Sequence, residues 1–563
     1  MIGIRATAWL LLAGACAMGQ YRRGVNVAGA EFGQSQIPGV FGRDYWFNSE
    51  NTFRYFGEKG LGLIRVPLLW ERLQPAPGGP LDAAYLNHLK DNIAWAGAHG
   101  AEVIIDIHNF GRYGGYILDN VYAGTVRVSS ADFADLWVRL SNEFKFAGAV
   151  YAYDLMNEPH DMGTANWEAI SQVALDAIRA NQDDKLVLVP GDSWSSANRW
   201  VTNHPRPWIQ DPANNFAYEA HQYFDHDESG TYGWSYDAEL ARNSDLANVG
   251  RTRVRHFLDW RLSNNVRGIV DEYGIPDSDA RWFTVLENFF AALDAAGVDG
   301  AYWAAGEWWG SYPLSVQPGA NFTPDRPQMA ALQAHAPGGY LTALSAASVT
   351  VARATAGSLV TLWGKGFTDQ TATTPGSAYP TALGDVTVQV TDASGAVVLA
   401  GLLYISPRQI NLQMPPLLAP GRATLTVLRG AAQTAAGSIQ VAETGPSIFT
   451  ANSAGFGPAA AQIIRVRPDN SQNWEPVTAI DFGDPSDRLF LALYGTGVRS
   501  AGAALRIGET DMRVDYAGTQ GQYPGLDQVQ TAELPRSLAG AGAVDVKFRI
   551  GGINANTVTI TFR

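Results

Sequence analysis

The order of hydrophobic and polar residues divides the chain into two unlike parts. Between about residues 22 and 336, short apolar runs alternate with longer stretches of helical periodicity, which is typical of repeated βα units around a parallel sheet. Eight such units in about 315 residues predict a (β/α)8 TIM barrel. A doubly wound open sheet is the competing fold, but the Gly-x-Gly-x-x-Gly or phosphate loop that such a sheet would favour does not follow the first run. The predicted strands are 24–28, 63–67, 102–108, 150–157, 186–190, 216–223, 268–273 and 300–303, with helices between them that include 82–97, 132–144, 167–181 and 281–296.

After residue 338 the helical periodicity disappears, and short alternating runs of Thr, Val, Ala and Gly are broken by turn residues, as in β-sandwiches. The segment 359–367 resembles 490–498, and 406–427 resembles 523–548, so the region contains a weak repeat. We expect two related β-sandwich modules joined near 444–446, with a single larger β domain as the alternative. The modules look similar to repeated C-terminal domains of secreted acidobacterial-type proteins, which implies an immunoglobulin-like character. The predicted domains are a barrel at 20–338 and modules at 339–445 and 446–563.

Aromatic residues in the β region bear on its role. A carbohydrate-binding module needs a line of exposed aromatic side chains, and Trp363, Tyr404, Trp474 and Tyr494 are available. Trp363 and Tyr494 occupy equivalent positions of the repeat, which we interpret as core positions. The sequence therefore favours a spacer or cell-surface attachment.

The N-terminus has the layout of a secretory signal over residues 1–19. Arg5 precedes an apolar run and small residues, and the run is too short to span a bilayer permanently. Cys16, the only cysteine, would be removed with the signal, unless it carries a lipid. We expect a secreted protein with no transmembrane segment, and attachment at the cell surface is an open alternative.

Charge and composition limit the kinds of molecule that the protein is expected to bind. The chain has 54 acidic and 40 basic residues and a net charge of −14, which argues against nucleic acid and anionic lipid. It also has 17 tryptophans, whose flat apolar faces suit sugar rings. A neutral polysaccharide fits better than a charged polymer.

Two glutamates end predicted strands, at the edge where a barrel enzyme builds its site. Glu158 follows the fourth strand and Glu272 ends the seventh. Hydrolysis of a glycosidic bond with retention needs two carboxyl groups about 5 Å apart, one to protonate the leaving oxygen and one to attack the anomeric carbon. The two positions predict such a pair.

The residues around these glutamates resemble a known family. Met156-Asn-Glu-Pro159 and Glu272-Tyr-Gly274 resemble the two active-site signatures of glycoside hydrolase family five, and the resemblance covers roughly residues 22 to 336. It implies a retaining enzyme with Glu158 as acid/base and Glu272 as nucleophile. Further matches follow in the family's order at other strand ends and imply substrate-binding roles for Arg65, His108, Asn157, His221, Tyr223 and Trp303.

The resemblance also gives these residues physical tasks. Arg65 would keep Glu272 ionised, unless it serves only as a buried structural ion pair. Asn157 would bind the sugar 2-hydroxyl and Tyr223 would contact Glu272. The two histidines would bind hydroxyls or orient the glutamates, or be satisfied core residues. Trp303 would stack under the sugar at the cleavage point, and Trp194 would lie on the leaving-group side, although both could fill space between loops.

Segments 303–312 and 218–225 look like endo-β-1,4-glucanases of the family, which favours internal cleavage of cellulose-type glucan. Asp271 and Glu307 depart from the family, which often has glycine and proline there, so mannan, mixed-linkage glucan and xyloglucan stay open. From another class, the chain could be a non-catalytic glycan-binding surface protein. We expect no metal and no cofactor, because no His-Glu-x-x-His occurs and Asp225-His-Asp-Glu228 fits a solvated loop better than a calcium site.

Overall fold

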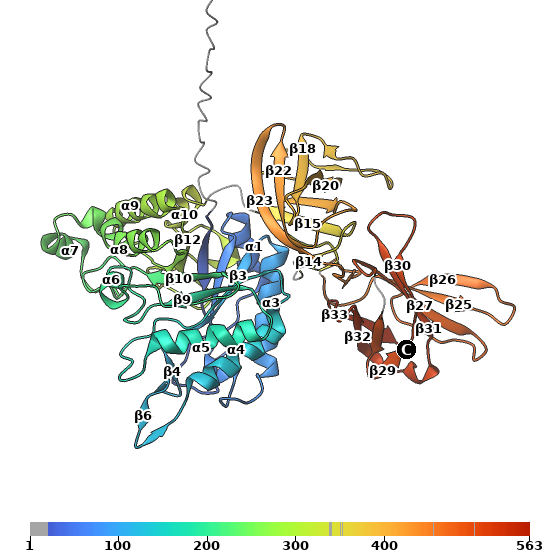
Figure 1. The fold of residues 1–563 in the computed structure, drawn as a ribbon, viewed down its shortest axis with the longest axis horizontal. Helices are drawn as coiled ribbons and strands as arrows, with labels where there is room; N and C mark the ends of the chain where they lie inside the picture. Colours follow the sequence, from blue (N-terminus) through green and yellow to red (C-terminus); the bar gives the residue numbers. More distant parts are fainter. Residues whose placement is uncertain (1–20, 337–340, 349–350, 352, 454, 500–501) are drawn as a thin grey trace, which may run out of the picture.

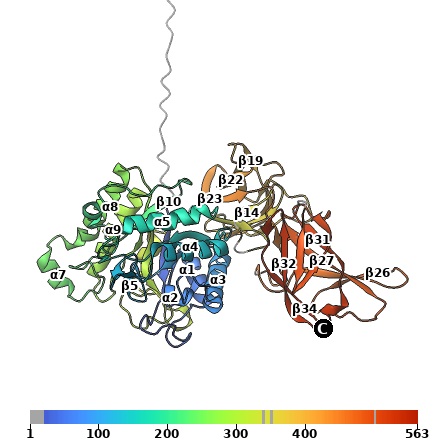
Figure 2. The ribbon, with the colours of Figure 1, turned by 60° about the horizontal axis from the view of Figure 1, so that its bottom comes forward.

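The computed structural model describes residues 21–336, 341–348, 351, 353–453, 455–499 and 502–563; the predicted signal segment 1–19, with Cys16, lies outside them. The described residues form a barrel, a first β module and a second β module, which lie in a row in both Figure 1 and Figure 2. No helix in the described ranges combines the length and the apolar character needed to cross a membrane.

Eight parallel strands close the barrel in the order β1-β12-β11-β10-β9-β8-β3-β2, which confirms the predicted (β/α)8 fold. Each predicted strand coincides with an observed one. The fourth observed strand ends at Asp154, before the predicted end. Leu155 and Met156 lengthen the apolar run of the sequence because they are fully buried, but they do not continue the strand ladder. The barrel strands are β1 (Arg23–Val27), β2 (Leu63–Leu68), β3 (Glu102–Ile107), β8 (Val150–Asp154), β9 (Leu186–Pro190), β10 (Phe216–His221), β11 (Gly268–Glu272) and β12 (Asp299–Ala305).

Helices surround the barrel and begin where side chains satisfy free backbone N–H groups. Ser129 and Asp132 form a capping box at the start of α4, and Asp82 and Asn166 cap α3 and α5. The helices are α1 (Glu50–Glu58), α2 (Trp70–Leu73), α3 (Ala83–Ala98), α4 (Ser130–Phe144), α5 (Trp167–Ala180), α6 (Trp200–Asn203), α7 (Tyr236–Arg242), α8 (Val249–Ser263), α9 (Arg281–Ala296) and α10 (Met329–Ala334), with 3₁₀ turns at Leu246–Asn248 and Ala320–Phe322. Two hairpins extend a loop after β3: β4 (Arg112–Tyr113) with β5 (Tyr116–Ile117), and β6 (Val121–Tyr122) with β7 (Thr125–Val126).

Inside the barrel an apolar layer supports a polar one. Residues two apart on a strand face the same side, so the apolar residue at one level is followed by a polar one at the next. On five strands the pairs are Leu63 and Arg65, Ile104 and Asp106, Ala152 and Asp154, Ala217 and Glu219, and Ile269 and Asp271. The second layer is fully buried and lies toward the carboxyl ends of the strands, directly beneath the position where the candidate glutamates emerge.

The first β module has two sheets, β13-β15-β21-β20-β16 and β14-β23-β22-β18-β17 with β19 on β18. They enclose their own apolar cluster, which contains Val360, Val388 and Leu425. Its strands are β13 (Leu341–Ser345), β14 (Arg353–Ala354), β15 (Leu359–Gly364), β16 (Ala372–Thr373), β17 (Ala382–Leu383), β18 (Val386–Thr391), β19 (Val397–Leu399), β20 (Gly401–Ile405), β21 (Gln409–Gln413), β22 (Gly421–Arg429) and β23 (Ala432–Val441).

The second β module also has two sheets, β26-β25-β27-β31-β30 with β24 on β27, and β29-β28-β32-β33 with β34 on β32. A separate cluster that contains Leu491, Val529 and Phe548 fills the space between them. Its strands are β24 (Ser447–Ile448), β25 (Ala461–Val466), β26 (Gln472–Pro476), β27 (Arg488–Thr496), β28 (Ala504–Ile507), β29 (Thr510–Met512), β30 (Val514–Thr519), β31 (Asp527–Glu533), β32 (Gly542–Ile550), β33 (Ile553–Asn554) and β34 (Val558–Phe562), with a 3₁₀ turn at Arg536–Leu538.

The core interpretation of Trp363 and Tyr494 is wrong. On β15 the side chains that enter the core are Val360 and Leu362, and strand alternation turns Trp363 to the opposite face, where it is half-buried. Tyr494 likewise faces away from the core and is half-buried. The repeat places the two aromatic residues on equivalent outer faces.

The first module packs against the end of the barrel where the strands begin. The Arg408 guanidinium donates to the Gly57 carbonyl, and Ala147 forms a bridge with Val351. Trp363 Cβ lies 3.5 Å from the position that a β-carbon on Gly100 would take. These contacts precede β2, β3 and β8 along the chain, so the module lies opposite the carboxyl ends of the strands.

Candidate active site

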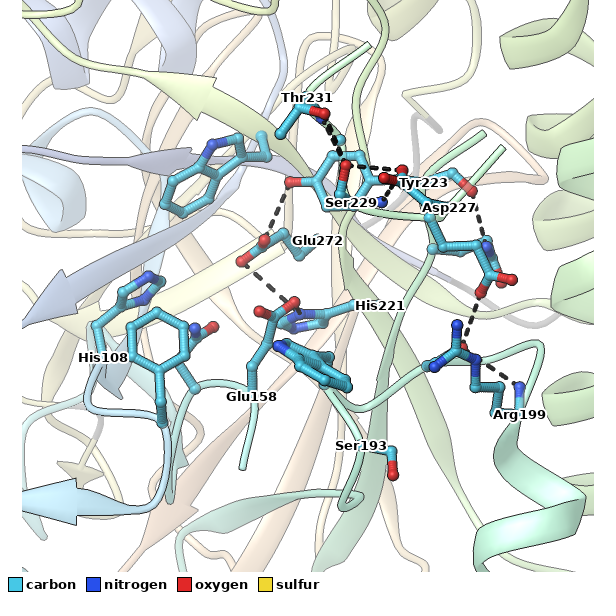
Figure 3. A pocket seen from close by; sticks show the side chains of 18 of the residues that line it. His108, Glu158, Ser193, Arg199, His221, Tyr223, Asp227, Ser229, Thr231 and Glu272 are labelled. Carbon is cyan, nitrogen blue, oxygen red and sulfur yellow. Dashed lines mark hydrogen bonds and ion pairs between the residues drawn. The ribbon is translucent and has the colours of Figure 1, made fainter. Parts of the chain in front are cut away.

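A cavity of about 590 Å³ opens at the carboxyl ends of the strands (Figure 3). Eight of the nine predicted site residues line it, and the ninth, Arg65, lies beneath it with no exposed surface. The eight are His108, Asn157, Glu158, Trp194, His221, Tyr223, Glu272 and Trp303.

Glu158 and Glu272 face each other across the floor of the cavity (Figure 3). One carboxylate oxygen of each lies within 4.8 Å of one of the other, and both lie within 4.8 Å of a ring nitrogen of His221. Glu158 is held in the left-handed backbone region, with φ of 44°, just after β8. Such a conformation costs free energy and is tolerated where the surrounding structure fixes it, so the turn aims this side chain into the cavity.

Both oxygens of Glu272 have donors. Arg65 Nη1 lies 3.2 Å from Oε2, and the Tyr223 hydroxyl donates to Oε1 over 3.0 Å. Tyr223 is buried, and its pKa is raised well above the usual value by burial and by the nearby Glu272 charge, so the phenol keeps its proton. The contacts predicted for Arg65 and Tyr223 are therefore present.

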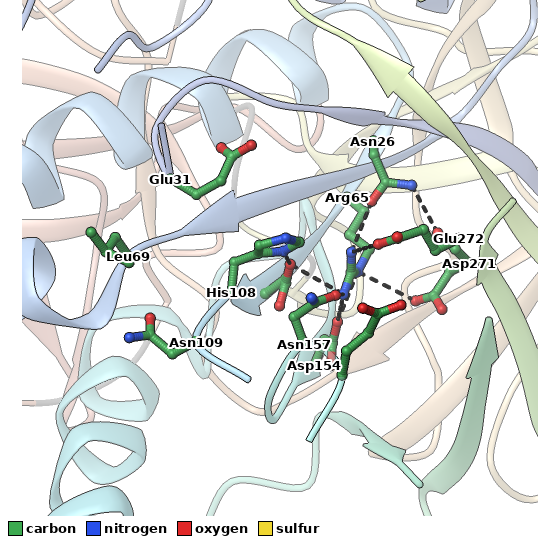
Figure 4. Close-up of polar contacts among 12 residues, drawn as sticks. Asn26, Glu31, Arg65, Leu69, His108, Asn109, Asp154, Asn157, Asp271 and Glu272 are labelled. Atoms are coloured by element: carbon green, nitrogen blue, oxygen red, sulfur yellow. Dashed lines mark hydrogen bonds and ion pairs between the residues drawn. The ribbon is translucent and has the colours of Figure 1, made fainter. Parts of the chain in front are cut away.

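Arg65 also organises the layer below (Figure 4). Its Nε donates to Asp154 Oδ2 over 2.8 Å, and its Nη2 donates to Asn157 Oδ1 over 2.9 Å. This contact occupies the Asn157 oxygen and leaves its amide hydrogens free to meet a sugar hydroxyl. Asn26 accepts from Nη1 over 3.0 Å, a positioning contact that the sequence analysis missed. Arg65 therefore contacts the predicted nucleophile Glu272 and also belongs to a buried ion-pair network.

Carboxyl groups outnumber cations in this layer. Burial, followed by neighbouring charges, raises the pKa of Asp106, Glu219 and Asp271. Asp271 stands where the family often has glycine, and its Oδ1 lies 3.6 Å from His221 Nε2. Protonation of part of this cluster is the physical consequence, because Arg65 and His221 together cannot balance every carboxylate at zero exposure.

His221 bridges the two levels. Its Nδ1 lies 2.9 Å from Glu158 Oε1, and its Nε2 lies 2.9 Å from Glu219 Oε1. Burial lowers the pKa of His221, but the charge of Glu272 and hydrogen bonds to Asp271, Glu158 and Glu219 outweigh burial and raise it well above its usual value. Both ring nitrogens then carry protons, and the imidazolium donates upward to Glu158 and downward to Glu219.

His108 differs from His221 in charge. Its Nδ1 lies 2.7 Å from Asp106 Oδ2, and its ring stacks on Trp303 at a centroid distance of 5.4 Å. Burial lowers the pKa of His108, so a neutral ring with a free Nε2 lines the cavity. Trp303 also lines the cavity.

Trp194 also lines the cavity; it is 41% exposed and stacks on His160 at a centroid distance of 4.5 Å. Sequence reasoning missed Phe110 and Tyr312, which also line the cavity. Both lie in loops after strands β3 and β12, where no periodicity marks them. Burial raises the pKa of Tyr312 to about 12, so its hydroxyl stays protonated.

A further hollow of about 510 Å³ shares His108 and Trp303 with the cavity and is also lined by Glu31, Phe32 and Trp309. Glu31 accepts a hydrogen bond from the Gly29 N–H over 2.8 Å. Burial raises the pKa of Glu31 to about 7. It is a titratable group that the sequence analysis did not identify.

Within the described ranges, two groups of side chains have a spacing that a metal ion accepts: Glu158 with His221 and Glu272, and Glu219 with His221 and Asp271. Both depend on His221, whose two ring nitrogens are engaged by Glu158 and Glu219. The Asp225 carboxylate of the acidic loop accepts backbone N–H groups of Gly230 and Tyr232. These contacts support the loop interpretation.

Glu307, the other departure from the family, points away from the cavity. Its Oε1 accepts from the Ser49 N–H, the Ser49 hydroxyl and the Thr52 hydroxyl, over 2.8, 2.6 and 2.8 Å. Its Oε2 accepts from Trp46 Nε1 over 3.2 Å. Glu307 therefore joins the loop after β12 to the start of α1.

Known proteins share this barrel. Residues 25–308 match the family described as Cellulase (glycosyl hydrolase family 5). The chain is 33% identical over 300 residues to probable endo-β-1,4-glucanase B of Neosartorya fischeri, which covers 52% of this chain and 85% of that protein. It is 32% identical over 299 residues to endo-β-1,4-glucanase B of Aspergillus niger, with coverage of 52% and 84%.

Two solved structures agree. The endo-β-1,4-glucanase from Xanthomonas axonopodis pv. citri is 37% identical with a TM-score of 0.51, and covers 56% of this chain and 98% of its own. The endoglucanase of Pseudomonas stutzeri in complex with cellobiose is 36% identical with a TM-score of 0.52, and covers 56% and 92%. The similarity accounts for about half of the chain, and the family match ends at Trp308, before the β modules.

Proposed function

Because the chain belongs to the glycosyl hydrolase family 5 cellulases and is a glycoside hydrolase, we propose that it cleaves internal β-1,4-glucosidic bonds of a cellulose-type glucan with retention at the anomeric carbon. The observation that carries the proposal is the pair of carboxylates, Glu158 and Glu272, with oxygens within 4.8 Å. A separation near 5 Å suits direct attack by a carboxylate, whereas inverting enzymes need room for a water between the groups.

In the first step Glu272 attacks the anomeric carbon while Glu158 protonates the departing glycosidic oxygen. Arg65 and Tyr223 hold the two oxygens of Glu272, which fixes the attacking geometry. His221 donates to Glu158 Oε1, which leaves the other oxygen of Glu158 to carry the catalytic proton toward the cavity.

In the second step a water attacks the glycosyl-enzyme ester, and Glu158, now ionised, takes the water's proton. Release of the sugar restores the Glu272 carboxylate. The amide of Asn157 is free to donate to the sugar hydroxyl beside the reacting carbon, a contact that strengthens as charge develops in the transition state.

The glucan preference is supported by the names of the relatives, since the four compared above are endoglucanases. The test is reducing-sugar release from carboxymethylcellulose, barley β-glucan and glucomannan by the wild type and Glu272→Gln. Release from the glucans that the variant lacks supports the proposal. Release confined to the mannan overturns the substrate, and anomeric NMR of the first product tests retention.

We further propose that the enzyme acts outside the cytoplasm, on the basis of the signal-like segment 1–19. The two-sheet architecture of both modules supports the immunoglobulin-like character that their sequence resemblance implies. The first module, fixed to the barrel through Arg408 and Val351, suits a spacer to a cell-surface or matrix attachment. Fractionation of the culture, followed by mass analysis of the mature N-terminus, tests export and lipidation of Cys16.

A further inference from the structure

The outer face of one sheet in the second β module is apolar where an ordinary sandwich face is polar. In an antiparallel sheet with one face on the core, the other face is normally solvated. Here Ile464, Val466 and Ala492 lie on the outer face and form a buried cluster of their own, with Phe490 packed against it. The cluster is separate from the core between the two sheets.

Aromatic rings lie on this base. Cross-strand pairing puts Trp474 of β26 and Phe490 of β27 on either side of Ile464, so all three share the outer face. Trp474 is 45% exposed and pairs directly with Ile464 of the apolar cluster. An indole with one covered and one open face is the form in which aromatic side chains meet sugar rings.

The opposite edge of the same sheet carries a second open ring. Tyr516 of β30 pairs with Gln530, which pairs with Ala492, so Tyr516 is on the same face. A β-carbon on Gly518 would lie 3.0 Å from the Tyr516 hydroxyl oxygen, so the absence of a side chain there lets the ring lie flat along the strand. Tyr516 is 44% exposed.

Amide side chains fill the space between the rings. Gln528 and Gln530 of β31 lie on this face and are partly exposed, and Gln462 of β25 accepts from the Tyr494 hydroxyl. Amides offer both donors and acceptors, which suits the hydroxyl groups of a neutral sugar. Charged residues of this face, Arg488 and Glu533, are confined to its ends.

The repeat shows that this face is used differently in the two modules. In the first module the equivalent face carries Trp363, which lies against Gly100 of the barrel. In the second module the corresponding Tyr494 shares its sheet face with the exposed Trp474 and Tyr516. A face that is covered in one copy is thus free in the other.

We propose that the outer face of the sheet β26-β25-β27-β31-β30 binds a neutral β-linked polysaccharide chain, with Trp474 and Tyr516 as stacking residues and the glutamine amides between them. The five strands span about 19 Å at about 4.8 Å per step, enough for several sugar rings end to end. The absence of central charge on this face, in a chain with a net charge of −14, fits a neutral polymer. The inference rests on the proposed function only for the choice of a β-glucan as the ligand.

Binding here would retain the enzyme on an insoluble polymer without adding a contact to the catalytic cavity. The first module meets the barrel at the end opposite the cavity, so the face is not a continuation of the active site. Two linked sites raise the effective concentration of each for the same polymer.

The test uses the full chain and a double variant, Trp474→Ala with Tyr516→Ala. We expect its association constant for insoluble cellulose, measured by depletion from solution, to fall about 30-fold, because two stacked rings at about one kcal/mol each together contribute about 2 kcal/mol. Turnover of carboxymethylcellulose should not change. Phe456→Ala is the matched control, since Phe456 is 43% exposed in the same module and lies outside the sheet.

A Trp474→Phe variant, which keeps a stacking ring, should recover most of the binding that Trp474→Ala loses. Equal binding by the wild type and the double variant overturns the proposal, and so does a dimeric wild type that the double variant makes monomeric, because the face would then be a contact between copies. If the wild type hydrolyses no glucan but binds cellulose through these residues, the proposed function fails and this inference stands.

Discussion

Glu307 departs from the family pattern, and its contacts in the structure give it a structural role that can be tested directly. Glu307→Ala removes one carboxylate that accepts four hydrogen bonds, two from Ser49, one from Thr52 and one from Trp46. Ser49 is the N-cap of α1, and its side chain makes no bond to the helix, since it is directed to Glu307 instead. The substitution therefore loosens both the β12 loop and the start of a helix.

The size of the effect follows from these contacts. A hydrogen bond to a charged group contributes about 1.5–3 kcal/mol when buried, and less when half-exposed, because water replaces the lost partner. Glu307 is half-buried, so the whole set is expected to contribute about 2–3 kcal/mol to the free energy of unfolding. For a barrel of this size, that lowers the melting temperature by roughly 5 °C.

The assay is a thermal melt paired with initial rates on carboxymethylcellulose and glucomannan. Glu307→Gln is the matched control, because its amide oxygen can still accept from Ser49 and Thr52, and we expect about half the loss. The ratio of the two rates should stay unchanged in both variants. A variant that melts like the wild type but changes that ratio would refute the structural role and return Glu307 to substrate selection.

Three further predictions concern the site. Glu31→Gln should gain up to about 3 kcal/mol of stability relative to the wild type as the pH rises from about 4.5 to 7. The reason is that a carboxyl whose pKa in the folded state is raised to about 7 stabilises the fold at low pH and loses that contribution as the pH rises through this window. Parallel curves of melting temperature against pH for the two proteins would contradict this prediction. Arg65→Lys should lower kcat about 100-fold in initial-rate assays, because one ammonium cannot hold Glu272, Asp154 and Asn157 together. Trp194→Ala should lower kcat/KM on polymers about 10-fold with little change in melting temperature, since the ring is exposed; a large melting shift would instead indicate packing.

Much of the barrel could be predicted because its strands are buried on both faces and read as apolar runs. The polar layer was also within reach. Polar residues such as Asp106, Asp154 and Glu219 each follow an apolar residue by two positions on a strand, a spacing that assigns both to the barrel interior. The fact that they surround Arg65 depends on strand order and register, which no single segment contains.

Residues supplied by loops were out of reach. Phe110 and Tyr312 line the cavity, but no periodicity connects a loop position with a distant strand end. Glu307 was linked to substrate preference because it stands where the family often has proline, whereas its contacts come from the start of α1. In the β modules, an alternating strand has two faces, and the repeat alone could not tell which of them Trp363 and Tyr494 occupy.

The docking of the first module on the strand-start end of the barrel has a consequence for geometry at a surface. The first module contacts the barrel on the side away from the cavity, at Gly57, Gly100 and Ala147. An enzyme held by its C-terminal part would therefore keep the opening of its active-site cavity directed away from the attachment point. It would cut polysaccharide chains other than the one to which it is attached. Such an enzyme would hydrolyse the polysaccharide around its attachment site and leave the attachment site intact.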